Sequence, residues 1–384
     1  MSVASRTARA WTVLLVIALA FAACARSPEA TKARHLARGD AYFQRGQYRA
    51  AILEYRNVLR VELTNARAIQ QLGLAHYHAG EWGQALRYLV KAREVAPDNL
   101  DVRLKLGAIS LAGGRHAEAH EEASAVLARE PRNVDALVLL AGGAQAPADV
   151  NAATRRLQEA RGEAGSSAKL LLALGALHLR QKDPGAAERA FQEALAREPK
   201  LIEARLALGE LYLGRRDPAQ AEREFKAAAE LAPAGAPAQL RLADFYGSVG
   251  KPEEAKRILG EITRKAPDAL PAWRRLAEIA FAERQYDETR RLLDVILKKN
   301  PSDLGAYLLR GRAHLAQRKT TEAAQDFGRA LKLEPKLAEA RFHLALTHIL
   351  AGNPQQAKTE LKVRVPAERE RPDRSNVNAW IGGT

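Results

Sequence analysis

The 384-residue chain contains one cysteine, Cys24, and only 5% of its residues are aromatic. A single cysteine excludes an intramolecular disulfide and any metal site built from several cysteines. The scarcity of aromatic residues, together with abundant Ala, Leu, Arg and Glu, favours helices that pack through small side chains over sheets. Because strand-like alternation of apolar and polar residues is also missing, the sequence predicts an all-α protein held together by packing.

Catalytic and nucleotide-binding motifs are missing too. The chain has no glycine-rich phosphate loop, no zinc-hydrolase helix motif and no nucleophile elbow. His116 and His120 are four residues apart, a spacing that can place two imidazoles on one metal ion, but the sequence offers no third ligand. We therefore expect a non-enzymatic protein with no cofactor and no metal, in which these histidines lie on a helix surface.

Long runs of basic residues are absent although the formal charge is +15. Such a charge favours anionic partners such as acidic polysaccharide or lipid headgroups, but a solvated basic surface without such a partner is commoner. Basic pairs such as Lys298-Lys299 lack the interleaved aromatic residues of single-strand nucleic-acid binders. Nucleic acid is therefore not expected as a partner.

The amino terminus resembles an export signal. Arg6 and Arg9 precede an apolar run from Trp11 to Ala23 that is too short to span a bilayer as a mature helix. This pattern predicts a cleaved signal peptide over residues 1–23.

The apolar run ends in Phe21-Ala22-Ala23-Cys24, which resembles a bacterial lipobox. That resemblance implies lipidation of Cys24 after cleavage, a tether over residues 24–31 and, with Arg26 in place of Asp, sorting to an outer membrane. The alternative is ordinary cleavage between Ala20 and Ala25.

A 34-residue period runs through the rest of the chain without an insertion. At position 8 of this frame all ten residues are Gly or Ala, and at position 20 nine of ten are Ala. The position-8 residues are Gly39, Gly73, Gly107, Ala141, Gly175, Gly209, Ala243, Ala277, Gly311 and Ala345. The position-20 residues are Ala51, Ala85, Ala119, Ala153, Ala187, Ala221, Ala255, Thr289, Ala323 and Ala357.

Proline closes seven of these units, and a large apolar residue such as Tyr55 or Phe225 usually occupies position 24. Over residues 32–361 the pattern resembles the tetratricopeptide (TPR) family. The resemblance implies an all-α α-solenoid, a right-handed superhelix of about ten helix-turn-helix repeats. Repeats one to three would cover residues 32–133, a degenerate fourth repeat 134–167, and repeats five to ten 168–361.

The recurring residue types have a physical reason. Small residues at positions 8 and 20 let two antiparallel helices approach closely, and position 24 fills the gap beside them. Glycines such as Gly46 and Gly250 are expected at the turn inside a repeat, and Pro97-Asp98-Asn99 and Pro301-Ser302-Asp303 should end one helix and cap the next.

Two segments depart from the pattern. Repeat four has Ala148 at its turn and Gly165 in place of the closing proline, which predicts a distorted unit. Residues 362–384 leave the frame and include the charged run Glu368-Arg369-Glu370-Arg371. We expect an irregular tail there, which fits a truncated or frame-shifted end, or a segment that orders on a partner.

In TPR proteins the first helix of each repeat lines a concave face, and the resemblance implies that positions 2, 5, 9, 12 and 13 face it. Eight of ten residues are apolar or aromatic at position 5, and likewise at position 12. This stripe is either an exposed interface or is covered by adjacent repeats. The residues expected to grip an extended segment or an anionic polymer are Gln70, Tyr77, His78, Arg180, Arg274, Phe281 and Arg312.

By resemblance to long envelope TPR lipoproteins, we expect a periplasm-facing, lipid-anchored scaffold that binds other envelope proteins, in exopolysaccharide export or envelope assembly. The alternative is a module that binds an anionic polysaccharide directly, through the net charge of about +13 that remains once the signal peptide is removed.

Overall fold

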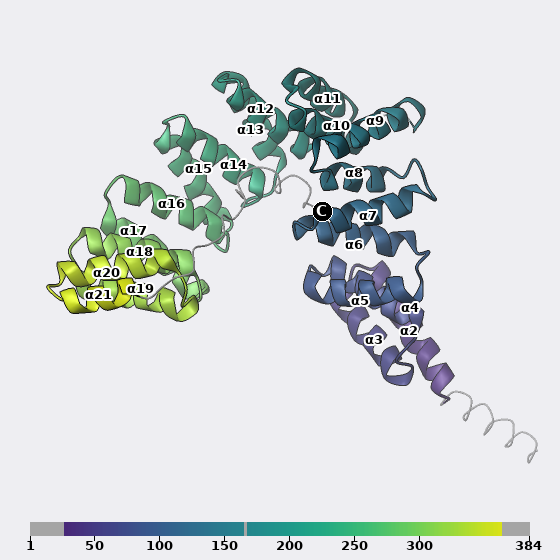
Figure 1. Ribbon diagram of the computed structural model, residues 1–384, viewed down its shortest axis with the longest axis horizontal. Helices are drawn as coiled ribbons and strands as arrows, with labels where there is room; N and C mark the ends of the chain where they lie inside the picture. The colour runs from purple at the N-terminus through teal and green to yellow at the C-terminus, as the bar shows by residue number, and fades with distance from the viewer. Residues whose placement is uncertain (1–26, 165–166, 363–384) are drawn as a thin grey trace, which may run out of the picture. The chain divides into compact units, whose positions relative to one another are not determined.

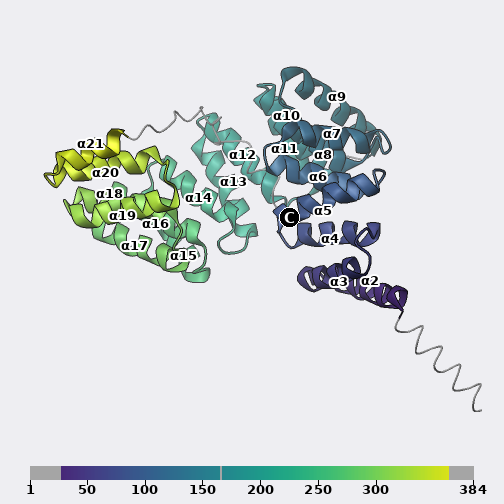
Figure 2. The same cartoon turned by 60° about the horizontal axis from the view of Figure 1, so that its bottom comes forward.

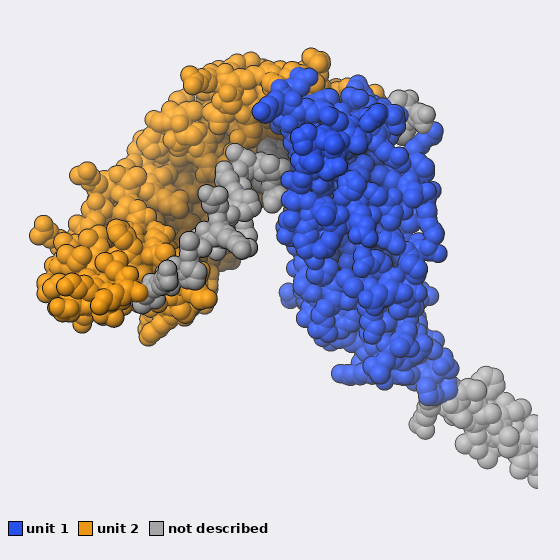
Figure 3. All heavy atoms as spheres, viewed as in Figure 1, with its two compact units in different colours: residues 1–183, 377–384 blue, residues 184–376 orange. Residues whose placement is uncertain are grey.

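The computed structural model describes residues 27–164 and 167–362, and the regular structure of these residues is entirely helical (Figure 1). This confirms the predicted all-α solenoid. Within the described residues the chain divides into two compact units, one ending at residue 183 and the other beginning at 184 (Figure 3). The division falls inside the fifth predicted repeat, between its two helices.

Helices come in pairs, and the first and second helix of each repeat alternate along the chain. The first helices are α2 (Pro28–Gln44), α4 (Ala66–His78), α6 (Leu100–Ala112), α8 (Val134–Gly143), α10 (Ala168–Arg180), α12 (Ile202–Gly214), α14 (Pro237–Ser248), α16 (Leu270–Ala282), α18 (Leu304–Ala316) and α20 (Ala338–Leu350). The second helices are α3 (Tyr48–Val61), α5 (Trp82–Val95), α7 (His116–Leu127), α9 (Pro147–Ala164), α11 (Pro184–Arg197), α13 (Pro218–Leu231), α15 (Pro252–Lys265), α17 (Tyr286–Lys299), α19 (Thr320–Leu333) and α21 (Pro354–Lys362).

The predicted 34-residue period is confirmed by where helices begin. In the first unit α4, α6, α8 and α10 begin at residues 66, 100, 134 and 168, and in the second unit α16, α18 and α20 begin at 270, 304 and 338. The stacking of successive pairs in each unit can be followed in a second view (Figure 2). Helix α2 begins at Pro28, within the segment expected to be a tether, because Ser27 caps it by accepting a hydrogen bond from the Ala30 backbone N–H at 3.1 Å.

The turn inside a repeat has the same conformation in nine repeats. Its central residue lies in the left-handed region, with φ between 60° and 78°, and the backbone N–H groups that follow cap the end of the first helix. Five of these residues are glycines, as predicted: Gly46, Gly80, Gly114, Gly250 and Gly352. Lys182, Arg216, Arg284 and Arg318 hold the same conformation in the other four repeats, where the sequence pattern did not predict it.

The predicted caps between repeats are also present. Asn99 accepts a hydrogen bond from the Val102 backbone N–H at 3.1 Å, and Asp303 accepts one from Ala306 at 2.9 Å. Each cap satisfies one of the free N–H groups at the start of a first helix.

The residues at positions 8 and 24 of a repeat are matched in size. A Cβ atom added to Gly209 would lie 2.7 Å from the Phe225 ring, and one added to Gly311 would lie 2.7 Å from the Phe327 ring. Every described repeat with an aromatic residue at position 24 has glycine at position 8, and every repeat with alanine at position 8 has leucine at position 24. The aromatic pairs are Gly39 with Tyr55, Gly175 with Phe191, Gly209 with Phe225 and Gly311 with Phe327, and the leucine pairs are Ala141 with Leu157, Ala243 with Leu259, Ala277 with Leu293 and Ala345 with Leu361.

This matching predicts a compensating pair of substitutions in repeat six. We expect Gly209→Ala to lower the free energy of unfolding by about 1–3 kcal/mol, because the new methyl group overlaps the buried Phe225 ring. Adding Phe225→Leu should recover most of that loss, since the double variant has the alanine–leucine pair that other repeats use. Urea unfolding of the two single variants and the double variant measures this coupling. Strictly additive effects would contradict the matching.

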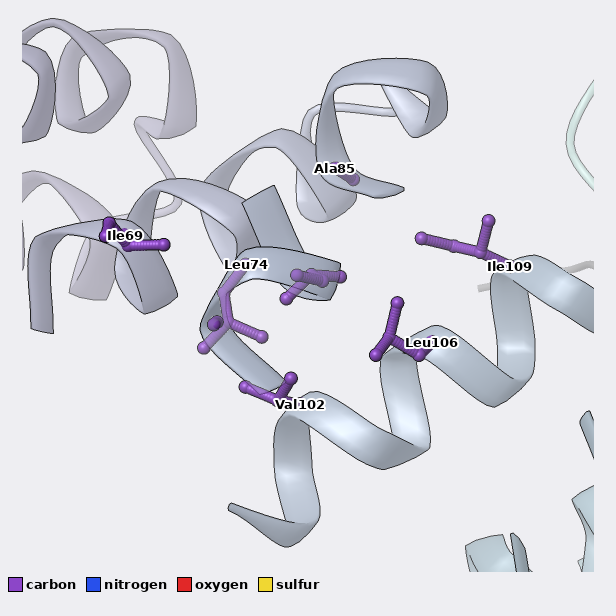
Figure 4. Close-up of a cluster of buried hydrophobic side chains, with 8 residues drawn as sticks. Ile69, Leu74, Ala85, Val102, Leu106 and Ile109 are labelled. Atoms are coloured by element: carbon purple, nitrogen blue, oxygen red, sulfur yellow. The ribbon is translucent and has the colours of Figure 1, made fainter. Parts of the chain in front are cut away.

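The core of the first unit lies between successive repeats. Leu74 of α4 meets Val102 and Leu106 of α6, with Ala85 of α5 at the edge of the cluster (Figure 4). These side chains are buried, so each repeat depends on its neighbour to cover its apolar face.

A polar link recurs beside this apolar core. In repeats three, six and ten an arginine at position 4 pairs with a glutamate at position 23 and donates to the backbone carbonyl of the preceding proline. Arg205, for example, contacts Glu224 Oε2 at 3.0 Å and Pro199 O at 3.0 Å. The equivalent links join Arg103 to Glu122 and Pro97, and Arg341 to Glu360 and Pro335. The link joins the two helices of a repeat to the turn that precedes them.

Repeat four differs from its neighbours, and Ala148, expected at its turn, lies in the second helix α9. Its first helix, α8, has 10 residues whereas α6 and α10 have 13, and it ends at Gly143 without the left-handed turn of the other repeats. Gly143 lies against α7, where an added Cβ would be 3.0 Å from His116 O and 3.1 Å from His120 N. The second helix begins directly at Pro147, a residue suited to a helix start.

Candidate functional site

A pocket of about 390 Å³ lies on the first three repeats, bordered mainly by first helices α2, α4 and α6. It brings together Gln70 and His78, two of the predicted site residues. The lining residues are Asp40, Phe43, Gln44, Tyr55, Arg67, Gln70, Gln71, Leu74, His78, Asp101 and Lys105.

The charges in this pocket are paired with one another. Arg67 Nη2 lies 2.6 Å from Asp40 Oδ2, and Lys105 Nζ lies 3.8 Å from Asp101 Oδ1. The Tyr55 hydroxyl also donates to Asp40, and burial raises its pKa above the ordinary value. The pocket therefore presents balanced charge to a ligand.

The glutamines of the pocket are its free hydrogen-bonding groups. The side-chain amides of Gln44, Gln70 and Gln71 make no hydrogen bond with any residue that the structure describes. A primary amide offers two donor hydrogens and an acceptor oxygen. These groups can therefore bind either the N–H or the C=O of an approaching chain.

Aromatic side chains form one wall beside the pocket. The His78 ring stacks on Tyr48 with centroids 5.0 Å apart, and Phe43 meets both rings edge-on. Tyr77 contacts His78 edge-on and lies under the Lys105 ammonium, 5.3 Å from it. Partial burial lowers the pKa of His78, and the nearby Lys105 ammonium lowers it further. Tyr77, the third predicted residue of this region, thus supports the wall and does not line the pocket.

The Arg180 guanidinium binds two backbone carbonyl groups of the preceding repeat. Its Nη1 donates to Ala141 O at 2.8 Å and to Ala144 O at 2.6 Å, at the end of α8. Ala144 occupies the position of Tyr42 and His76, whose carbonyl groups accept from the turn in ordinary repeats, and Ala141 lies in the last turn of the shortened α8. The guanidinium predicted to contact a partner therefore caps the distorted repeat four.

Arg274 is also engaged within the protein. Its Nη2 lies 2.6 and 2.7 Å from the two carboxylate oxygens of Asp303, the residue that caps α18. The pair joins α16 to the start of α18, so Arg274 supports the array whether or not it meets a ligand.

Phe281 and Arg312 come together as a pair. The Arg312 guanidinium carbon lies 5.0 Å from the centroid of the Phe281 ring, a cation–π arrangement between α16 and α18. Tyr286 also meets Phe281 edge-on.

The apolar stripe at positions 5 and 12 is covered in part. Most of its members, such as Leu36, Leu206 and Leu308, are half-buried, because the first helices of neighbouring repeats lie beside them. The last described repeat differs, since 58% of Phe342 and 54% of Ile349 are exposed.

Cys24, the predicted lipidation site, lies outside the described residues, as do the signal peptide and residues 363–384 of the expected irregular tail, whereas Lys362 ends α21. Across residues 27–164 and 167–362, no helix has both the length and the apolar character needed to cross a bilayer. The same residues contain no group of three or more His, Cys, Asp or Glu side chains placed to hold a metal ion.

Sequence reasoning missed Asp40, Gln44, Gln71 and Lys105. Asp40 and Gln44 occupy positions 9 and 13, which the family pattern already placed on the concave face. Gln71 and Lys105 occupy position 6, which that pattern does not include, so no sequence signal marked them.

Comparison with protein families matches the model described as "Tetratricopeptide repeat" to residues 76–141, 178–228, 212–279, 248–313 and 314–381, and that described as "TPR repeat" to residues 39–80. These matches cover more than half of the chain. A search of curated proteins found no match.

Several solved structures are similar in fold. Yeast Tom70 is 15% identical over 87% of this chain and 91% of that chain, with a TM-score of 0.40. TTC0263, a TPR protein of Thermus thermophilus, is 25% identical over 47% of this chain and 98% of that chain, with a TM-score of 0.43. The human IFIT1 dimer with m7Gppp-AAAA is 18% identical over 80% of this chain and 72% of that chain, with a TM-score of 0.46.

Proposed function

The chain belongs to the tetratricopeptide repeat family, and from that premise we propose that it is a non-catalytic scaffold of a bacterial cell envelope that holds extended segments of other proteins. The observation that carries this proposal is the amide-lined pocket on repeats one to three. An extended peptide carries a regular series of N–H and C=O groups, which the free amides of Gln44, Gln70 and Gln71 complement.

Charge balance in the pocket favours a protein partner over a polyanion. Arg67 and Lys105 each have a carboxylate within 4 Å, and two of the three predicted groove arginines, Arg180 and Arg274, are bound inside the protein. A polymer of sugar acids needs a row of unpaired cations, which these positions do not offer. Direct binding of an anionic polysaccharide remains the alternative that the experiment below separates.

The envelope location rests on the amino-terminal sequence. Arg6, Arg9 and the apolar run to Ala23 support export, and the lone Cys24 after Ala22-Ala23 supports a lipid anchor facing the periplasm. Resemblance to long TPR lipoproteins supports a place in exopolysaccharide export or envelope assembly.

Site-specific crosslinking in intact cells tests the proposal. With the photoreactive residue p-benzoylphenylalanine at position 70 of the full-length chain, we expect a discrete adduct that protease treatment removes and that fractionates with membranes. The matched control places the same residue at Gln84, an exposed glutamine on α5 of the same repeat. Cys24→Ser should release the adduct from the membrane fraction.

Equal adducts from positions 70 and 84, or none from position 70, would refute a partner site in this pocket. An adduct that resists protease and is removed by polysaccharide-degrading enzymes would favour the alternative function.

A further inference from the structure

Arg312 is the exception among the arginines on the first helices α16, α18 and α20. The other four each pair with a carboxylate, whereas no described carboxylate lies within ion-pair distance of Arg312. The four pairs are Arg274 with Asp303, Arg275 with Asp244, Arg310 with Asp326, and Arg341 with Glu360. Arg312 is half-buried, so its charge is partly removed from water without a compensating anion.

Arg312 also differs from the residues at the same position of the preceding repeats. Position 9 carries an acid in the three preceding repeats, and in two of them that acid pairs with an arginine of the next repeat: Glu210 with Arg241, and Asp244 with Arg275. In repeat nine position 9 is Arg312, and the residue facing it from α20 is His343. Burial and the Arg312 guanidinium lower the pKa of His343, whereas Glu339 of α20, whose Oε1 lies 3.9 Å from His343 Nε2, raises it. Glu339 is not within ion-pair distance of Arg312.

One apolar side chain contacts the unpaired guanidinium, and two others are exposed on the next first helix. Phe281 lies beneath it at 5.0 Å, and on α20 Phe342 and Leu350 are more than half exposed. Arg312, Phe342 and Leu350 occupy positions 9, 5 and 13. In the first unit these positions are Asp40, Gln70 and His78, which line one pocket. The repeat geometry therefore places Arg312, Phe342 and Leu350 on one face of the second unit.

We propose that this face, which we call the Arg312 surface (Phe281, Arg312, Phe342 and Leu350), binds a single carboxylate side chain flanked by apolar residues in an extended segment of a partner protein. The inference rests on the proposed function, because it assumes a peptide partner and adds the chemistry that the second unit selects. One unpaired guanidinium can form a charge-assisted ion pair with one carboxylate. Burial of the exposed apolar side chains against apolar residues of the partner adds favourable free energy.

Selection of displayed peptides tests the chemistry directly. Random dodecapeptides are selected on the immobilised full-length chain and on its Arg312→Gln and Arg312→Glu variants. The native chain should enrich Asp or Glu next to Leu, Ile or Phe, Arg312→Gln should lose the acid preference, and Arg312→Glu should prefer Lys or Arg at that place. A selected peptide should lose about tenfold in affinity when its acid becomes Gln, which corresponds to about 1.4 kcal/mol.

Arg329→Glu is the matched control, because Arg329 is exposed on the second helix α19. It should leave the selected peptides unchanged. The NMR titration of His343 reports on the surface itself. Arg312→Gln, or binding of an acidic peptide, should raise the pKa of His343, because each removes or neutralises the cation that lowers it.

Acid preference that persists in Arg312→Gln, or peptides without acid preference on the native chain, would overturn the Arg312 surface while leaving the pocket on repeats one to three intact. No enrichment at all would also overturn it. The proposed function fails separately, when position 70 yields no protein adduct. If Arg312→Gln weakens binding to alginate and no peptide is enriched, the surface recognises sugar acids and the inference is wrong.

Discussion

Asp326→Ala is expected to lower the free energy of unfolding of the second unit by about 3 kcal/mol. The Asp326 carboxylate is only 5% exposed, and it accepts from Arg310 Nη2 at 2.6 Å and contacts His314 Nδ1 at 3.0 Å. Removal leaves His314 buried without its partner, and Arg310 keeps only the outer carboxylate of Asp294. Urea unfolding, with hydrogen exchange of α18 and α19 as a local readout, measures the loss.

Asp294→Ala provides a matched control because it removes the other partner of the same arginine. The Asp294 side chain is 61% exposed, so its loss should cost less than about 1 kcal/mol. Equal effects of the two substitutions would show that burial does not strengthen the Asp326 contacts.

Arg180→Met is expected to destabilise the first unit by about 2–4 kcal/mol, because two backbone carbonyl groups at the end of α8 lose charge-assisted hydrogen bonds. Methionine keeps much of the apolar stem, so the effect isolates the guanidinium. Arg180→Lys should recover part of the loss, because the ammonium group still donates hydrogen bonds. Recovery should be incomplete, since lysine lacks the planar arrangement of several donors in the guanidinium. Hydrogen exchange of α8 and α10 locates the change.

The control for this substitution is Arg155→Met on the exposed face of α9, which should be nearly neutral. If Arg180→Met left the melting temperature unchanged but abolished partner binding, the arginine would belong to a ligand site, as its repeat position first indicated, and the capping role would be wrong.

Local features of the fold could be predicted from the sequence, whereas the partners of long side chains could not. The period, the turn glycines and the caps at Asn99 and Asp303 were predictable because each depends on residues a few positions apart. Arg180 and Arg274 were placed on a binding face from their positions in the repeat. The structure shows them bound to groups 36 or 39 and 29 residues away.

Side-chain reach explains the difference. Position in a helix fixes the direction in which a side chain leaves the backbone, but a long arginine can then turn to any acceptor within several ångströms. The acceptors come from neighbouring repeats, and no local pattern marks them. Phe281 and Arg312, by contrast, were expected on the same face and are in contact, because the face of the aromatic ring offers a large area for a cation–π contact.

The three arginines and one lysine at left-handed turns were unexpected for another reason. Glycine is the usual residue there, and a side chain costs about 1–2 kcal/mol in this conformation. Arg216 and Arg318 adopt it because the capping hydrogen bonds of the turn, from Asp217 N to Tyr212 O and from Lys319 N to His314 O, fix the backbone. The repeat frame therefore specifies the turn even where the residue disfavours it.

The size matching between positions 8 and 24 limits the ways in which repeats can be added to such a chain by duplication of its gene. Both partners of a match, such as Gly311 and Phe327, lie within one repeat, so duplication of an entire 34-residue segment carries a compatible pair into the new copy. A recombination junction between the two helices could instead join an alanine-bearing first helix to a phenylalanine-bearing second helix and produce a clash. Viable crossovers should therefore fall in the connections between repeats, which makes the whole helix pair the heritable module of this array.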